Sequence, residues 1–126
     1  MPKKTIHTDR APAAVGPYSQ AVISGGLLFT SGQLPIDPAT GKIPEGDIEN
    51  RAHIVFKNLE AIARQAGTSL DDAVKTTVYL ADMGTFQAVN KVYAQYFKEP
   101  YPARSAFQVA ALPLGADIEV EAIFQL

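Results

Sequence analysis

The C-terminal part of the chain alternates between apolar and polar residues, which is the two-residue period of half-buried strands. One alternating run covers residues 102–112 and the next covers residues 116–124, with a break containing Pro and Gly between them. This pattern predicts two antiparallel strands joined by a short loop. On such a hairpin Arg104 would point to the same side as Glu119 and Glu121, so it can lie near either one, depending on the register.

Two longer segments have the period of an amphipathic helix. The apolar positions of residues 47–66 recur on one face every 3.6 residues, which predicts a helix there. Asp47 is suited to the N-cap of this helix, and Gly67 to its C-terminal stop. A second helix is predicted at roughly residues 83–97, and Asp82 is placed to cap it.

Short apolar runs bounded by Gly and Pro predict further strands at residues 5–8, 18–24, 27–31 and 74–80. Gly25-Gly26 separates two of these runs and predicts a hairpin turn, because glycine adopts positive φ without strain. Residues 9–17 and 34–46 contain several prolines and are expected to be loops. The predicted order is β-β-β-α-β-α-β-β in one α+β domain over residues 1–126, a two-layer mixed β-sheet with two helices on one face.

The sheet face left uncovered by the helices has an unusual predicted composition. It would carry Lys75, Thr77, Tyr79, Arg104, Ala106, Gln108, Glu119, Glu121 and Ile123. This mixture is too polar for a core, and parts of it are too apolar for bulk solvent. We therefore expect a homo-oligomer whose interfaces cover this face.

Composition excludes several classes of function. The 126 residues are 47% apolar and 19% charged, which is ordinary for a globular protein with one core. The sequence contains no cysteine, so disulfides, thiolate catalysis and cysteine-ligated metals are excluded. The net charge is −2 and the basic residues are dispersed, which argues against nucleic-acid binding. Neither a membrane-length apolar run nor a secretory signal is evident, so we expect a cytoplasmic location without a membrane partner.

Few chemically reactive groups remain. The histidines, His7 and His53, have no companion ligands at a spacing typical of metal sites, and no nucleotide-binding loop or nucleophile elbow is present. The groups that remain available for chemistry are carboxylates, Arg104, hydroxyls and backbone amides. They suit acid–base chemistry on a small anion, because arginine binds a carboxylate through two parallel hydrogen bonds and a glutamate can deprotonate a water.

The most reactive candidates also have purely structural interpretations. Glu119 and Glu121 fit the solvent side of a half-buried strand. Arg104 fits a cross-strand ion pair as well as it fits a clamp for a ligand. The residue pattern by itself leaves both interpretations of these three residues open.

Three further positions are similarly ambiguous. Asn90 adjoins the apolar side of the second helix, where it either caps a neighbouring loop or reaches a site. Ser31-Gly32 ends a strand, which suits a turn or a loop whose backbone N–H meets a ligand. Tyr18 suits the core or the lid of a pocket, and its hydroxyl needs a partner in either place.

Several separated motifs are spread along the chain. The most specific one is Pro102-Ala103-Arg104-Ser105-x-Phe107, followed by Ile118-Glu119-Val120-Glu121-Ala122. The others are Ala11–Gln20, Thr30–Pro35, Val74–Leu80 and Val89-Asn90-x-x-Tyr93. In this order, and over essentially the whole chain, they resemble the motifs of the reactive intermediate deaminases, the Rid/YjgF family.

The resemblance implies a chorismate-mutase-like fold that assembles as a homotrimer, with ligand sites in the clefts between subunits. It also implies hydrolysis of reactive 2-imino acids, such as 2-iminobutanoate and 2-iminopropanoate, to 2-keto acids and ammonia. No metal or organic cofactor is expected, because a protonated imine is already a strong electrophile.

The same resemblance implies roles for individual residues. Arg104 matches the arginine that binds the substrate carboxylate. Glu119 matches the glutamate that holds the attacking water, with Glu121 in support. The implied substrate-binding residues are Tyr18, Ser31, Gly32, Asn90, Arg104 and Ala106. Many active members of the family have cysteine at the position of Ala106, so this side chain is not expected to be essential, although its identity can alter pocket shape or substrate preference.

Two other classes of function stay open at this point. The same cleft would suit a module that binds 2-keto acids or other small carboxylates without turnover. Some relatives are described as endoribonucleases, but the acidic balance of this chain and the lack of a basic or aromatic track argue against that activity.

Overall fold

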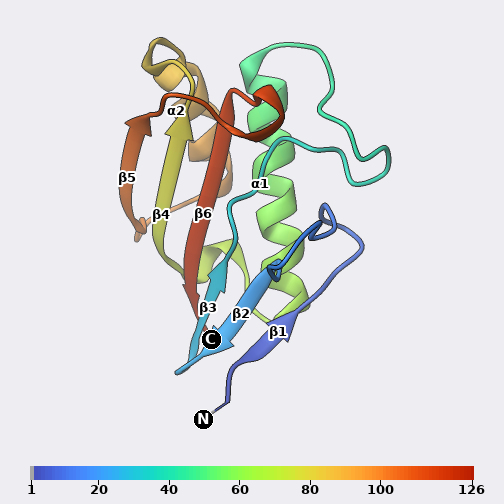
Figure 1. The fold of residues 1–126 in the computed structure, drawn as a ribbon. Coiled ribbons are helices and arrows are strands. Elements are labelled where there is room, and N and C mark those ends of the chain that lie inside the picture. Colours follow the sequence, from blue (N-terminus) through green and yellow to red (C-terminus); the bar gives the residue numbers. More distant parts are fainter. Residues whose placement is uncertain (1) are drawn as a thin grey trace.

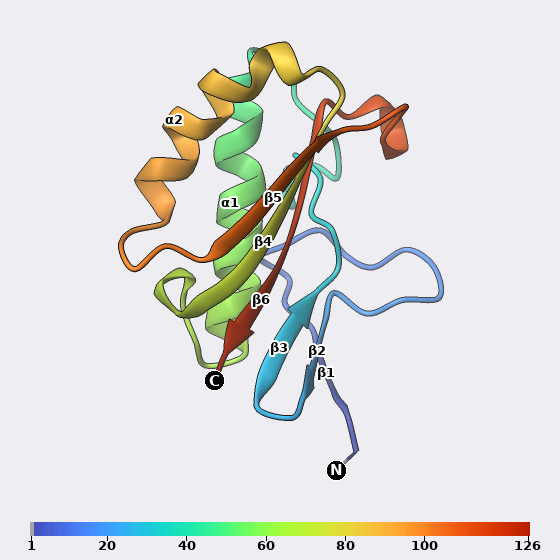
Figure 2. The ribbon, with the colours of Figure 1, turned by 90° about the vertical axis from the view of Figure 1, so that its left-hand side faces the viewer.

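A computed structural model describes residues 2–126 as a six-stranded mixed sheet with two helices on one face (Figures 1 and 2). The strands are β1 (Lys4–Ile6), β2 (Ala21–Ser24), β3 (Leu27–Thr30), β4 (Ala73–Leu80), β5 (Ala103–Gln108) and β6 (Ile118–Gln125). The helices are α1 (Ile48–Gln65) and α2 (Phe86–Tyr96), with short 3-10 turns at Leu70–Asp72, Met83–Thr85 and Pro113–Gly115. The strand order is β1-β2-β3-β6-β4-β5. The predicted α+β class and element order are confirmed.

Local signals set the ends of the elements close to their predicted places. The Asp47 side chain accepts a hydrogen bond from the backbone N–H of Asn50 at 2.8 Å and caps α1. Gly67, with φ of +87°, stops the helix. Gly25 and Gly26 have positive φ in the β2–β3 turn, as the hairpin requires. Asp82 caps a 3-10 turn, and α2 begins only after it.

The predicted C-terminal hairpin is wrong, because β5 and β6 do not pair. Strand β4 lies between them, parallel to β5 and antiparallel to β6. Residues 109–117 cross the end of β4, where the N–H of Val109 donates to the carbonyl of Leu80 and the N–H of Ala81 donates to that of Asp117. Alternation determines which face a side chain takes, but it does not determine which strand lies next to it. Two strand spacings together measure about 10 Å, and residues 109–117 easily span that distance.

This strand order separates two residues that the hairpin would have placed together. Arg104 is paired with Thr76 of β4 and hydrogen-bonds Asn90 of α2, so it lies on the helix-covered face. Glu119 is paired with Tyr79 of β4 and lies on the opposite, uncovered face. The expectation that Arg104 adjoins Glu119 or its neighbour within one chain is therefore wrong.

The register also corrects the predicted membership of the uncovered face. Ala106 and Gln108 share the helix-covered face with Arg104, because side chains alternate along β5. Ser105 and Phe107 point to the uncovered face instead. The Phe107 ring stacks on Tyr79 with a centroid distance of 6.4 Å and remains 52% exposed.

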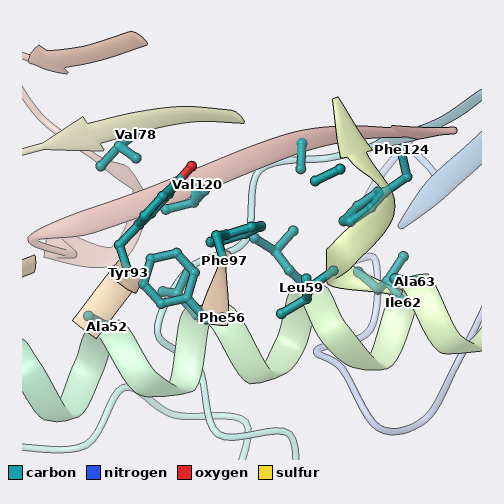
Figure 3. Packing of buried hydrophobic residues seen from close by; sticks show 14 of the residues in the cluster. Ala52, Phe56, Leu59, Ile62, Ala63, Val78, Tyr93, Phe97, Val120 and Phe124 are labelled. Atoms are coloured by element: carbon teal, nitrogen blue, oxygen red, sulfur yellow. The ribbon is translucent and has the colours of Figure 1, made fainter. Parts of the chain in front are cut away.

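The core fills the space between the helices and the sheet (Figure 3). The apolar stripe of α1 meets the inner face of the strands, and Phe56 packs edge-on against Phe97 and Tyr93. Phe124 of β6 and Leu59 of α1 are completely buried. Each such side chain contributes about 1.5–3 kcal/mol when fully buried, so this layer holds the sheet that carries the site. Within residues 2–126, neither helix has the length and hydrophobicity needed to cross a bilayer.

Candidate active site

A cavity of about 540 Å³ opens where β3 ends and β6 begins. Four of the predicted site residues line it, namely Tyr18, Ser31, Gly32 and Glu119. The remaining lining is largely apolar and comes from Pro12, Ala13, Val15, Gln20, Gln33, Leu34, Ile36, Pro113 and Leu114. One carboxylate in a mainly apolar hollow is the arrangement expected of a small-molecule site.

Glu119 is seated against the backbone of Gly32. The neighbouring residues Gln33 and Val120 exchange two backbone hydrogen bonds, at 2.8 and 3.1 Å, which bring the β3–α1 loop beside β6. A Cβ atom added at Gly32 would collide with Oε2 of Glu119 and lie only 2.7 Å from its Cδ. The glycine therefore makes room for the carboxylate, a role that the sequence did not reveal.

The environment of Glu119 raises the pKa of its carboxyl group above the ordinary value. Burial of Glu119 makes the larger contribution to this increase in pKa, and the negative charge of Glu121 makes the smaller one. No side chain among the described residues donates a hydrogen bond to this carboxylate in the structure. Glu119 thus has a raised pKa and carboxylate oxygens that accept no side-chain hydrogen bond, and both features suit a general base for a water molecule.

The loop before β2 is held over this cavity by Gln20, a buried residue that the sequence did not single out. Its side-chain amide donates to the carbonyls of Thr8 and Pro12, at 3.0 and 2.8 Å. Tyr18, 51% exposed, lies at the rim. The Ser31 hydroxyl donates to the carbonyl of Ser19 at 2.6 Å, so toward a ligand it can serve as an acceptor. The one sequence signal for this role was the place of Gln20 at the end of the Ala11–Gln20 motif.

Arg104 lies in a second cavity, of about 400 Å³, between β5 and α2. One Nη1–H group of Arg104 donates to Oδ1 of Asn90 at 2.7 Å. The guanidinium carbon is 4.7 Å from the ring centre of Tyr93 and 5.2 Å from that of Phe86. The Arg104 side chain makes no other hydrogen bond within residues 2–126, so its remaining N–H groups are available to an anion.

Six of the seven predicted site residues are therefore distributed over two half-sites. Tyr18, Ser31, Gly32 and Glu119 share the first cavity, which we call the glutamate half-site. Asn90 and Arg104 share the second, which we call the arginine half-site. Ala106 lines neither cavity and packs against the core. The two half-sites lie on opposite faces of one sheet.

Metal-binding potential is low in the described part of the chain. Residues 2–126 contain no group of three or more His, Asp or Glu side chains arranged to hold a metal ion. His7 is paired with Asp9, and His53 with Tyr96, both outside the two half-sites. The groups that line the two half-sites include the arginine, the glutamate and hydrogen-bonding groups.

The structure defines an α+β protein with two cavities beside a mixed sheet, and the comparisons give its family. A family model described as Endoribonuclease L-PSP matches residues 8–125. The RutC family protein y4sK of Sinorhizobium fredii is 55% identical over 121 residues, which are 96% of each chain. The human 2-iminobutanoate/2-iminopropanoate deaminase is 46% identical over 121 residues, covering 96% of this chain and 88% of the human protein.

Structural similarity leads to the same family. The crystal structure of YyfA from Yersinia pestis, described as a conserved Rid family protein of unknown function, superposes with a TM-score of 0.97. It is 47% identical, and the match covers 99% of this chain and 100% of that one. The chain belongs to the Rid/YjgF family, as its sequence motifs indicated.

Proposed function

We propose that this protein hydrolyses reactive 2-imino acids, such as 2-iminobutanoate and 2-iminopropanoate, to 2-keto acids and ammonia. The observation that carries the proposal is the pair of complementary half-sites, one with an anion-binding guanidinium and one with a carboxylate of raised pKa. The name of the human relative supports this substrate class.

We further propose that each active site forms between two subunits of a homotrimer. Arg104 and Glu119 lie on opposite faces of the sheet, so one chain cannot bring both to a small substrate. Head-to-tail association would join the arginine half-site of one copy to the glutamate half-site of the next, and such contacts close into a ring. The exposed Phe107 and Phe29 on the uncovered face favour its burial by another copy. A ring of three is the assembly that the family resemblance implies.

In the proposed mechanism, Arg104 binds the carboxylate of the imino acid and thereby places its C2 atom beside Glu119 of the adjacent subunit. Glu119 accepts a proton from water as the oxygen bonds to C2 and the C=N π electrons move to nitrogen. The resulting carbinolamine nitrogen is protonated, the C–N bond breaks and ammonia leaves, while the hydroxyl proton is lost to give the keto acid. Orientation of this kind supplies several kcal/mol, with an upper range of about 7–11.

The proposal is tested with a trapping assay. Threonine dehydratase generates 2-iminobutanoate in the presence of semicarbazide, and semicarbazone formation is followed with and without this protein. We expect the protein to suppress trapping, and Arg104→Ala to lose this activity by roughly 100-fold or more. Arg64→Ala, which alters an exposed arginine on α1, is the matched control and should behave like the parent protein.

Unimpaired suppression by a folded Arg104→Ala variant would contradict the role of Arg104. A parent protein that leaves trapping unchanged would contradict hydrolysis. If it still binds 2-keto acids, it would be a binding module instead. RNA cleavage that disappears with the same substitution would favour an endoribonuclease.

The pH dependence of hydrolysis should follow the environment of Glu119. Because burial and then Glu121 raise its pKa, the active carboxylate is lost at a higher pH than for an ordinary glutamate, and kcat/KM falls as the pH drops through that value. Glu121→Gln removes the smaller cause, so the acidic limb of the pH profile should move to lower pH. Glu45→Gln, in an exposed loop, is the control. A limb that does not move, or moves to higher pH, would show that Glu119 is not the titrating base.

A further inference from the structure

Three residues of α2 form a continuous surface against Arg104. Phe86, Asn90 and Tyr93 follow one another at spacings of four and three residues, so they lie on one face of the helix. Asn90 accepts the hydrogen bond from Nη1, and both rings lie within cation–π distance of the guanidinium carbon. A single charged group thus has a polar contact and two aromatic contacts from one helix.

The two aromatic residues of this surface are also held by contacts that do not involve Arg104. The Tyr93 hydroxyl is hydrogen-bonded to Oγ1 of Thr76 at 2.8 Å, and its ring stacks on Phe97 at 4.4 Å. Tyr93 is only 5% exposed, and Phe86 is partly buried against the core. Thr76 is also the residue paired with Arg104 across β4 and β5. The aromatic contacts therefore rest on the core and on β4, and they do not depend on the Arg104 side chain.

A flexible arginine on an edge strand would otherwise sample many rotamers. Its planar guanidinium interacts with aromatic rings and with hydrogen-bond acceptors at its edge. Here one N–H is used by Asn90, which leaves other N–H groups for the two parallel bonds to a carboxylate. Preorganisation of this kind strengthens ligand binding because the side chain is ordered before the ligand arrives.

We infer that Phe86, Asn90 and Tyr93 form a guanidinium-binding cradle, and that Phe86 and Tyr93 are positioning residues acting through Arg104. The cradle binds guanidinium as a chemical group, so it will accept the free guanidinium ion when the Arg104 side chain is removed. The expected effect of the cradle on KM rests on the proposed function, whereas its binding of the free guanidinium ion does not.

The first experiment measures binding directly. Guanidinium chloride is titrated into Arg104→Ala while the side-chain amide signals of Asn90 are followed by NMR, up to about 50 mM and far below the molar concentrations that unfold proteins. We expect saturable chemical-shift changes that are absent in Arg104→Ala/Phe86→Leu. They should also be absent with methylammonium, which has the same charge but is not planar. Shifts that are the same in both variants, or the same for both cations, would overturn the cradle.

The second experiment uses the reaction. Guanidinium is expected to restore part of the imine hydrolysis of Arg104→Ala but not that of Arg104→Ala/Phe86→Leu. In the otherwise intact protein, Phe86→Leu should raise KM roughly 3- to 30-fold with little change in kcat, while Phe86→Tyr keeps KM near its original value. A fall in kcat with unchanged KM, or equal damage by Leu and Tyr, would show that Phe86 has only a structural role.

The two experiments separate the two proposals. If the parent protein does not hydrolyse imines but free guanidinium still binds Arg104→Ala selectively, the proposed reaction fails and the cradle stands. If the parent is active but guanidinium neither binds nor restores activity, the reaction stands and the cradle fails.

Discussion

An equimolar mixture of the Arg104→Ala and Glu119→Gln variants is expected to hydrolyse 2-imino acids, although each variant alone loses roughly 100-fold or more. The reason is the position of the two side chains on opposite faces of one sheet. If each site takes its arginine from one subunit and its glutamate from the next, a mixed ring contains some sites with both groups intact. Over all randomly assembled rings about a quarter of the sites satisfy this condition, and in a three-membered ring that contains both variants about one third do.

The measurement requires subunits that have exchanged. The two variants are unfolded together, refolded and separated by size, and mixed rings are isolated with two different affinity tags. We expect activity per site of about one third of the parent value, since head-to-tail contacts in a three-membered ring with both variants leave one intact site in three. Each variant refolded alone is the control. Isolated mixed rings without activity would mean that the two half-sites do not combine across subunits.

The second large effect is expected at Gly32, where alanine should reduce imine hydrolysis by roughly 100-fold or more by displacing the general base. The added Cβ would occupy the space of the Glu119 carboxylate, at 2.7 Å from its Cδ. The backbone at Gly32 does not have positive φ, so alanine is compatible with the chain itself. The loss of activity therefore comes from displacement of the glutamate. It is measured as a fall in kcat/KM in the trapping assay.

Two comparisons isolate this cause. Gly26→Ala, in the β2–β3 turn, has no atom within 4 Å of its added Cβ and should leave the activity of folded protein intact, although its φ of +78° strains the turn. Overpacking by Gly32→Ala is expected to lower the free energy of unfolding by about 1–3 kcal/mol. That loss should largely disappear in a Glu119→Ala background, because the colliding atoms are gone. An equal loss in both backgrounds would contradict the displacement of Glu119.

Local sequence signals predicted the elements of this protein well. The 3.6-residue period and Asp47 located α1, because a helix is stabilised by contacts within a few residues and by its own cap. Gly25-Gly26 located the β2–β3 turn for a similarly local reason. Alternation also predicted which residues of β6 face the core, since side chains alternate along any strand.

The same signals misplaced Arg104 relative to Glu119. Alternation is a property of one strand, whereas strand order depends on contacts between distant segments. Here α2 returns the chain so that β5 adds in parallel to the outer side of β4, and the hairpin that the spacing favoured does not form. Arginine and glutamate consequently lie on opposite faces, and one chain carries two half-sites in place of one complete site.

By itself, the sequence determined the α+β class and the family, because these follow from local periodicity and from motifs read along the chain. It also supplied the candidate residues for the chemistry. Only the tertiary structure decided how those residues are grouped. The seat of Glu119 on Gly32 and the aromatic contacts of Arg104 each join segments far apart in sequence. Packing of α2 on the sheet creates the contacts of Arg104, and the pairing of Gln33 with Val120 brings Gly32 to Glu119. No local pattern encodes which distant residue will be the partner.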